Sequence, residues 1–137
     1  MKLLLVVQRY GPEVTGGSEA LCRAIAQRLA ERHEVSVATS CATDYVTWAN
    51  ALPPGTSHDG RVTVHRFESA RQRPLQEFWR LSDRLFDDQA SADEQARWFA
   101  LNGPDVPGLL EFVRTRGGDF DRVLFFCLLY TSPSPRD

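Results

Sequence analysis

The first forty residues carry the pattern that most limits what this chain can fold into. Residues 3–7 form a continuous aliphatic run, which is typical of a strand covered on both faces of a parallel sheet. A loop containing Gly16 and Gly17 follows, and Ser18 is the predicted N-cap of a helix that runs to about Arg32. Residues 34–39 then alternate as a second strand. A β-α-β unit this short predicts parallel strands joined by a right-handed crossover.

The residues that follow continue the α/β pattern. A stretch rich in turn residues predicts a hairpin-type return before a third strand over 61–67. Two helices are predicted between about residues 74 and 101, the second opened by a capping box of Ser91 and Glu94. Their aromatic residues are predicted to face the core; these are Phe78, Trp79, Trp98 and Phe99.

A helix over 107–116 and a fourth, buried strand over 123–126 complete the predicted elements. Residues 1–126 are therefore expected to form an α/β, Rossmann-like parallel sheet with flanking helices. The run 127–137 changes to a Ser/Pro-rich composition and resembles the translated read-through of a sequencing adaptor, so we expect a non-native or disordered tail there. On that interpretation the domain is incomplete, interrupted at its fourth strand.

Composition narrows the function classes. The chain has 42% hydrophobic residues, 25% charged residues and a net charge of -2, which fits one soluble globular domain and argues against a nucleic-acid partner. Its three cysteines form no C-x-x-C pair, so neither a disulfide framework nor a metal site is expected. No apolar run approaches the length of a transmembrane segment, and we expect a cytoplasmic protein. Peripheral contact with a membrane stays open.

The loop between the first strand and the first helix is the strongest candidate site. Ligands of open α/β sheets bind beyond the carboxyl ends of the strands, and a helix N-terminus offers N–H groups and partial positive charge to an anion. Gly16, Gly17 and Ser18 would stand there, where glycine lets a phosphate approach the backbone. The spacing is neither G-x-G-x-x-G nor a P-loop. A tight turn that serves the fold alone explains the two glycines equally well.

Four runs resemble the N-terminal domain of bacterial family 4 glycosyltransferases. They are residues 10–19 (YGPEVTGGSE), 41–50 (CATDYVTWAN), 60–67 (GRVTVHRF) and the pair Gly103-Pro104. The resemblance spans about residues 2–126. It implies a GT-B fold of two Rossmann-like domains, with the acceptor held mainly by the N-terminal domain and the nucleotide sugar by the C-terminal one. It also implies a retaining transfer that needs no metal or other cofactor, with Gly16 and Gly17 near the donor diphosphate.

The same resemblance limits what this chain can do. The acceptor would be a glycan or lipid-linked glycan, but the donor domain has no counterpart here. We therefore expect a truncated, inactive part of the enzyme, and no catalytic residue can be placed.

The acceptor-side candidates are Arg9, Asp44, Tyr45 and Trp48, because they follow the carboxyl ends of the first two predicted strands. Trp48 would stack on a sugar ring or, alternatively, anchor its own loop by burial. Arg9 would pair with an anionic ligand or, alternatively, with a surface carboxylate.

Two other functions stay open on the sequence. A nicotinamide-dependent oxidoreductase shares the first β-α-β unit, although it expects an acidic residue at the end of the second strand, where Thr39-Ser40-Cys41 stand. A non-catalytic module that binds a carbohydrate or a partner protein is the other alternative.

Overall fold

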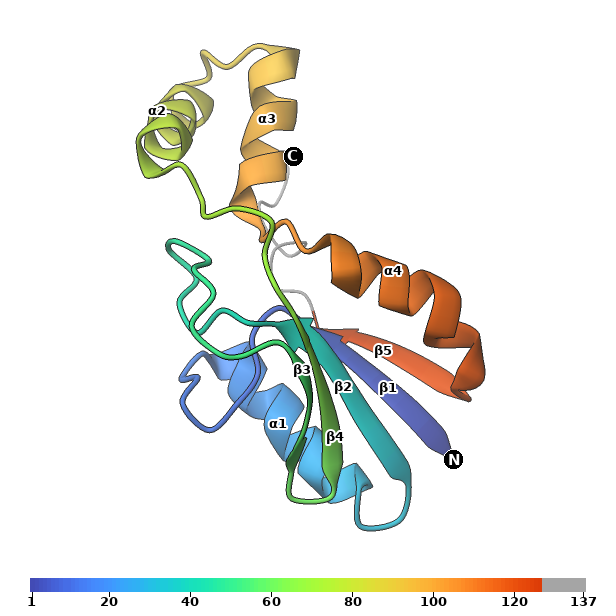
Figure 1. Ribbon diagram of the computed structural model, residues 1–137. Helices are drawn as coiled ribbons and strands as arrows, with labels where there is room; N and C mark the ends of the chain where they lie inside the picture. Colours follow the sequence, from blue (N-terminus) through green and yellow to red (C-terminus); the bar gives the residue numbers. More distant parts are fainter. Residues whose placement is uncertain (127–137) are drawn as a thin grey trace.

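The computed structural model describes residues 1–126, which form one five-stranded sheet with helices on both faces (Figure 1). The predicted tail, residues 127–137, lies outside the described residues. In chain order the elements are β1 (Lys2–Val7), α1 (Gly17–Leu29), β2 (Glu34–Ser40), β3 (Gly55–Asp59), β4 (Val62–Phe67), α2 (Leu75–Phe86), α3 (Ala92–Asn102), α4 (Pro107–Arg116), the 3-10 turn η1 (Gly117–Asp119) and β5 (Arg122–Phe126).

The strand order of the sheet is β3-β4-β2-β1-β5. β4, β2, β1 and β5 run parallel, with Leu5 opposite Val37 and Val6 opposite Phe125. The α/β class is confirmed, and the order of the parallel strands is compatible with a Rossmann-like fold. The predicted parallel sheet is present in these four strands, and the predicted hairpin-type return is β3, which pairs antiparallel with β4. The sheet is mixed.

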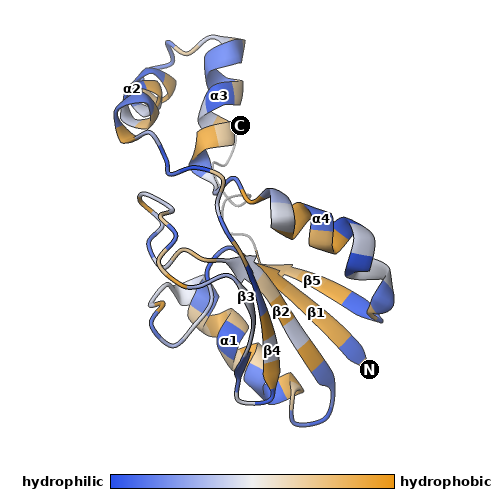
Figure 2. Cartoon of the chain, in the orientation of Figure 1, coloured by the Kyte–Doolittle hydropathy of each residue, from blue (hydrophilic) through white to orange (hydrophobic). Residues whose placement is uncertain are grey.

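The aliphatic run in β1 is buried on both sides, as its composition predicts. Leu3, Leu5 and Val7 join the core beneath α1, whereas Leu4 and Val6 join the core beneath α4. The alternation follows from the pleat of the strand, which sends successive side chains to opposite faces. Figure 2 shows this apolar layer running through β1 and β2. The helices α1 and α4 therefore cover opposite faces of the sheet.

The first helix begins and ends earlier than predicted. Gly16, not Ser18, is the N-cap, and it has no side-chain cap; Ser18 is the second helical residue. Glycine is accepted at an N-cap, and a larger residue at position 16 would overlap the side chains of Glu19 and Arg9 unless they shifted. The small residues Cys22 and Ala26 are buried against the sheet, while Leu21 is exposed. Small side chains let the helix axis approach the sheet closely.

Helices α2 and α3 form a hairpin that stands beyond the carboxyl ends of the strands (Figure 1). The predicted capping box of Ser91 and Glu94 is present and starts α3. Trp98 packs inside the hairpin as predicted, but Trp79 and Phe99 are more than half exposed, so their assignment to the core is wrong. A two-helix hairpin has only one inner face, and these two side chains lie outside it.

The fourth predicted strand is present as β5, but it is not buried. In the described part of the chain β5 is an edge strand, paired on one side with β1. Leu124 and Phe125 are exposed, since α4 covers this end of the sheet only in part and itself has no fully buried residue. The apolar composition of the run RVLFF is typical of a central strand. Its position at the edge follows from the order of the strands in the sheet, which the composition does not reveal.

Candidate functional site

The predicted site residues lie where the carboxyl ends of the parallel strands meet. Arg9 and Gly16 belong to the connection between β1 and α1, and Gly17 begins α1. Asp44 and Trp48 belong to the connection between β2 and β3. The chain crosses from one side of β1 to the other before β5, so the switch point of this sheet lies between β1 and β5. In open α/β sheets ligands bind in the crevice at that point.

Arg9 joins the two connections. Its Nε and Nη2 atoms donate to Glu19 Oε1 over 3.1 and 2.8 Å, and its Nη1 atom donates to the carbonyl of Thr43 over 2.9 Å. The ring of Tyr45 lies 5.2 Å from the guanidinium carbon. Because Arg9 is buried and balanced by Glu19, it fixes the loops rather than standing ready for an anion.

The two glycines have different surroundings. A Cβ atom on Gly16 would overlap a carboxylate oxygen of Glu19 and lie 2.7 Å from Arg9 Nη2. A Cβ atom on Gly17 would meet no described atom within 4 Å. A larger residue at position 16 would therefore displace the ion pair beside it, whereas Gly17 leaves open space at the first turn of α1. Ser18, the next residue, is half-buried.

Asp44 organises its own loop. Its carboxylate accepts hydrogen bonds from the backbone N–H of Val46 at 2.7 Å and from the hydroxyl of Thr47 at 2.7 Å. The hydrogen bond from Val46, followed by the one from Thr47, holds the pKa of Asp44 below its ordinary value. Tyr45 is exposed beside it and reaches the guanidinium of Arg9. An ionised Asp44 with an exposed neighbouring ring suits recognition of hydroxyl groups.

Trp48 is buried, with 3% of its surface exposed, in a left-handed backbone conformation with φ of 58°. Its Nε1 atom has no hydrogen-bond partner within residues 1–126. The guanidinium carbon of Arg73 lies 5.7 Å from its ring and 4.2 Å from the ring of Phe78. In this conformation Trp48 anchors its loop against the base of the α2–α3 hairpin, the second of the two roles open from the sequence.

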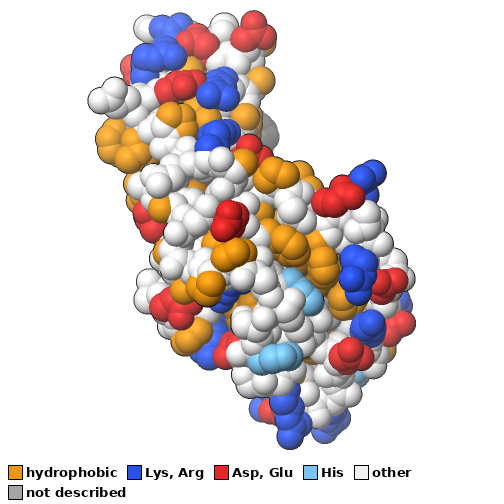
Figure 3. Space-filling model, viewed as in Figure 1, with side chains coloured by type: hydrophobic (Ala, Val, Ile, Leu, Met, Phe, Trp, Pro, Cys, Tyr) orange, Lys and Arg blue, Asp and Glu red, His pale blue; other side chains and the backbone are white. Residues whose placement is uncertain are grey.

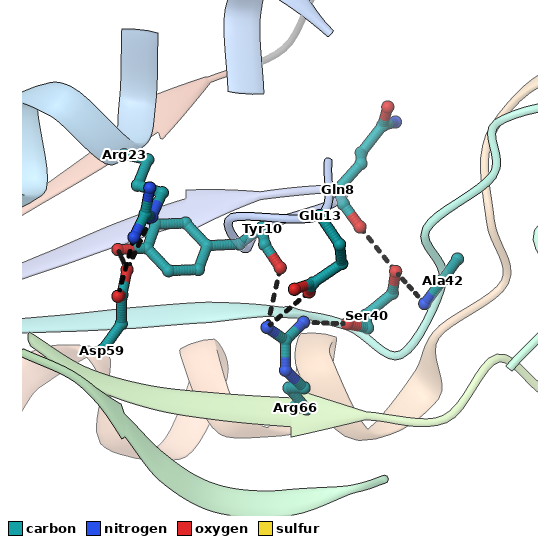
Figure 4. Close-up of polar contacts among 8 residues, drawn as sticks. All are labelled: Gln8, Tyr10, Glu13, Arg23, Ser40, Ala42, Asp59 and Arg66. Carbon is teal, nitrogen blue, oxygen red and sulfur yellow. Dashed lines mark hydrogen bonds and ion pairs between the residues drawn. The ribbon is translucent and has the colours of Figure 1, made fainter. Parts of the chain in front are cut away.

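A second network fixes the loop after β1, and sequence reasoning missed it (Figure 4). Arg66 donates from Nη2 to the carbonyl of Tyr10 over 2.7 Å and from Nη1 to the carbonyl of Ser40 over 3.3 Å. The hydroxyl of Tyr10 donates to Asp59 over 2.8 Å, and Arg23 donates to the same carboxylate. The partners are far apart in sequence, so no local spacing signals them.

Both ends of this network have shifted proton affinities. Burial, then the hydrogen bond to Asp59, raises the pKa of Tyr10. Chiefly the hydrogen bond from Arg23 lowers the pKa of Asp59. Burial also raises the pKa of Cys22 to about 12, which disfavours its thiolate form.

A cavity of about 660 Å³ lies on the α4 face of the sheet, and sequence reasoning missed it too. It opens between the ends of β1 and β5 and the connection from α3 to α4, and it is bordered by Gln8, Phe125 and Gly103. The glycines of the β1–α1 loop do not line it. Figure 3 shows apolar side chains gathered over α4, where it borders the α2–α3 hairpin. Only Gly103-Pro104 could have signalled this place in the sequence.

Within residues 1–126 no group of three or more His, Cys, Asp or Glu side chains could hold a metal ion. None of the helices in the same residues has the length and apolar character needed to span a membrane. Compared with models of protein families, with curated proteins and with solved structures, the chain gives no match. The class defined by the fold is an α/β domain compatible with a Rossmann-like fold, with a cavity on the α4 face of its carboxyl edge and open space at Gly17 on the α1 face.

Proposed function

We propose that this chain is the acceptor-side part of a glycosyltransferase, which moves a sugar from a nucleotide-sugar donor to a glycan or lipid-linked glycan. The proposal is supported by the four sequence runs that resemble family 4 enzymes, and by the place of two of them in the fold. Residues 10–19 and 41–50 come together at the carboxyl edge of the sheet through Arg9, Glu19 and Thr43. In this proposal the parent enzyme retains the configuration of the sugar and uses neither metal nor cofactor.

One observation carries the donor side of the proposal. The first turn of α1 has open space at Gly17, and the acidic residue of that turn, Glu19, is neutralised by Arg9. An unpaired carboxylate there would repel a diphosphate, whereas the neutralised pair leaves the N–H groups and the positive end of the helix dipole to act. The site therefore suits an anion that approaches Gly17.

A titration with uridine diphosphate tests this step. We expect the backbone amide resonances of Gly17 and Ser18 to shift and saturate, and we expect G17V to weaken that binding by roughly tenfold, about 1.4 kcal/mol. Shifts spread over the whole surface, or equal binding by G17V, would contradict the donor site. V46A, a change at an exposed position of the other loop, serves as the control.

A transfer assay and the genomic locus test the rest. We expect no sugar transfer from any nucleotide sugar by the purified chain, because the proposal assigns only the contact with the donor diphosphate to this chain and the rest of the donor site to a second domain. The locus beyond codon 126 should continue for roughly 200 or more codons and encode that domain. A native stop codon close to that point would overturn the assignment as a glycosyltransferase.

A further inference from the structure

The cavity on the α4 face has no role in the proposed donor site, since the glycines of the β1–α1 loop do not line it. Its volume of about 660 Å³ falls within the range of small-molecule sites, roughly 300–1,000 Å³. It also lies at the switch point between β1 and β5, where open α/β sheets bind their ligands. Size and position both indicate a ligand cavity.

The walls of the cavity are mostly apolar. They combine the ends of two strands with one side of α4 and the end of α3, through Val6, Val7, Phe99, Val106, Leu109, Leu110, Val113 and Phe125. Leu110 and Phe125 are 72% and 62% exposed, although both are large apolar side chains. A ligand that covered them would remove apolar surface from water, which is favourable by about 25 cal/mol per Å².

The polar residues of the cavity are two with neutral amide side chains, Gln8 and Asn102, and two with charged side chains that each have a partner of opposite charge, Asp105 and Arg114. The side-chain amides of Gln8 and Asn102 line it, and neither has a hydrogen-bond partner in the described part of the chain. Arg114 is paired with Glu111 over 2.8 Å, and Asp105 lies 3.9 Å from Arg71. An amide both donates and accepts hydrogen bonds, so it matches hydroxyl groups, which do the same.

We propose that this cavity binds an uncharged amphipathic molecule with an apolar chain and a hydroxylated head, such as an alkyl glycoside. The chain lies against Leu110 and Phe125, and the hydroxyl groups of the head bind the amides of Gln8 and Asn102. The further identification of this molecule as the sugar acceptor rests on the proposed function. The binding itself does not.

Octyl β-D-glucoside, used below the concentration at which it forms micelles, is the probe. Calorimetric titration of the full chain should show saturable binding of one molecule, weakened at least about tenfold in L110E. F86E is the matched control, because Phe86 is 71% exposed on α2 and does not line the cavity. Equal weakening by both variants, or no saturable binding by the unaltered chain, would overturn the proposal.

Two further measurements complete the test. Octyl sulfate should bind more weakly than the glucoside, and N102L should remove that difference; equal binding of both probes by the unaltered chain would overturn the assignment of the head. Light scattering should show the same mass for the chain and L110E. A dimer that L110E dissociates would make this face an interface between copies instead. No nucleotide is present in these experiments. A failure of glucoside binding would therefore not affect the outcome of the uridine diphosphate titration, and the two results can be told apart.

Discussion

Arg9 and Glu19 form an ion pair that solvent hardly reaches. Arg9 Nη2 lies 2.8 Å from Glu19 Oε1, and the two side chains are 9% and 11% exposed. Removing one partner of such a pair leaves an uncompensated buried charge, which is far more destabilising than the loss of a surface pair.

We therefore expect E19Q to lower the free energy of unfolding by about 3 kcal/mol. The matched control is E111Q, because Glu111 forms an ion pair with Arg114 on the exposed side of α4. Such pairs contribute about 0–1 kcal/mol. Urea unfolding followed by circular dichroism measures both changes, and equal unfolding midpoints for the two variants would contradict burial of the Arg9 charge.

The neighbouring glycines should respond in opposite directions. G16A places a methyl group against Glu19 and Arg9, so we expect a loss of about 1–3 kcal/mol in unfolding free energy. G17A meets no described atom and replaces glycine inside a helix, so we expect a gain of about 0.5–1 kcal/mol. Thermal unfolding of the two variants side by side is the measurement. A gain in both would show that the contact at Gly16 is absent in solution.

At position 48, replacement of the tryptophan by glycine should destabilise the fold less than replacement by alanine. Either change removes a buried indole, with an expected loss of about 3–5 kcal/mol. The left-handed conformation at this residue disfavours a Cβ by about 1–2 kcal/mol, so W48G should be more stable than W48A by about 1 kcal/mol. Urea titration measures the difference. The reverse order would mean that φ at this position is negative in solution.

Asp59 should make the free energy of unfolding depend on pH in the acid range. Its pKa is lower in the folded state, so its ionised form stabilises the fold above the unfolded pKa of about 3.9. That stabilisation is lost as the pH falls through the lower, folded pKa. The difference in unfolding free energy between the unaltered chain and D59N should therefore be constant above about pH 5 and should shrink below about pH 4.

Tyr10 supplies the control for that experiment. Y10F removes one hydrogen bond to Asp59 and leaves the carboxylate paired with Arg23, the main cause of its shifted pKa. We expect Y10F to be less stable than the unaltered chain yet to keep most of its dependence on acid. An acid dependence that D59N retains in full would assign the effect to other carboxylates.

The sequence predicts the parts of this fold that depend on local pattern. The run in β1 is buried because five aliphatic residues in succession leave no solvated face, and the start of α3 follows from the capping box at Ser91. Ser18 is not the N-cap because α1 begins at Gly17, one residue before it, and the chain turns into the helix at Gly16 beside the ion pair of Arg9 and Glu19. Local propensity gives way wherever a tertiary contact is stronger.

The candidate site was predictable in place but not in detail. The connections after β1 and β2 come together because parallel strands end at one edge. The partner of Tyr10, in contrast, is Asp59, 49 residues away, and pairing over that distance leaves no mark in local spacing. The exposure of β5 could likewise not be predicted from the sequence, since an edge strand and a central strand can share an apolar composition.

The buried apolar cluster of the α2–α3 hairpin is formed by residues of these two helices. Its members are Phe78, Leu81, Leu85, Trp98 and Leu101, and Arg73 joins the base of the hairpin to Trp48. Such a unit can open while the sheet stays folded. Its amide hydrogens should exchange with solvent sooner than those of β1 and β2. The hairpin beside the cavity would then unfold locally as a unit, before the sheet does.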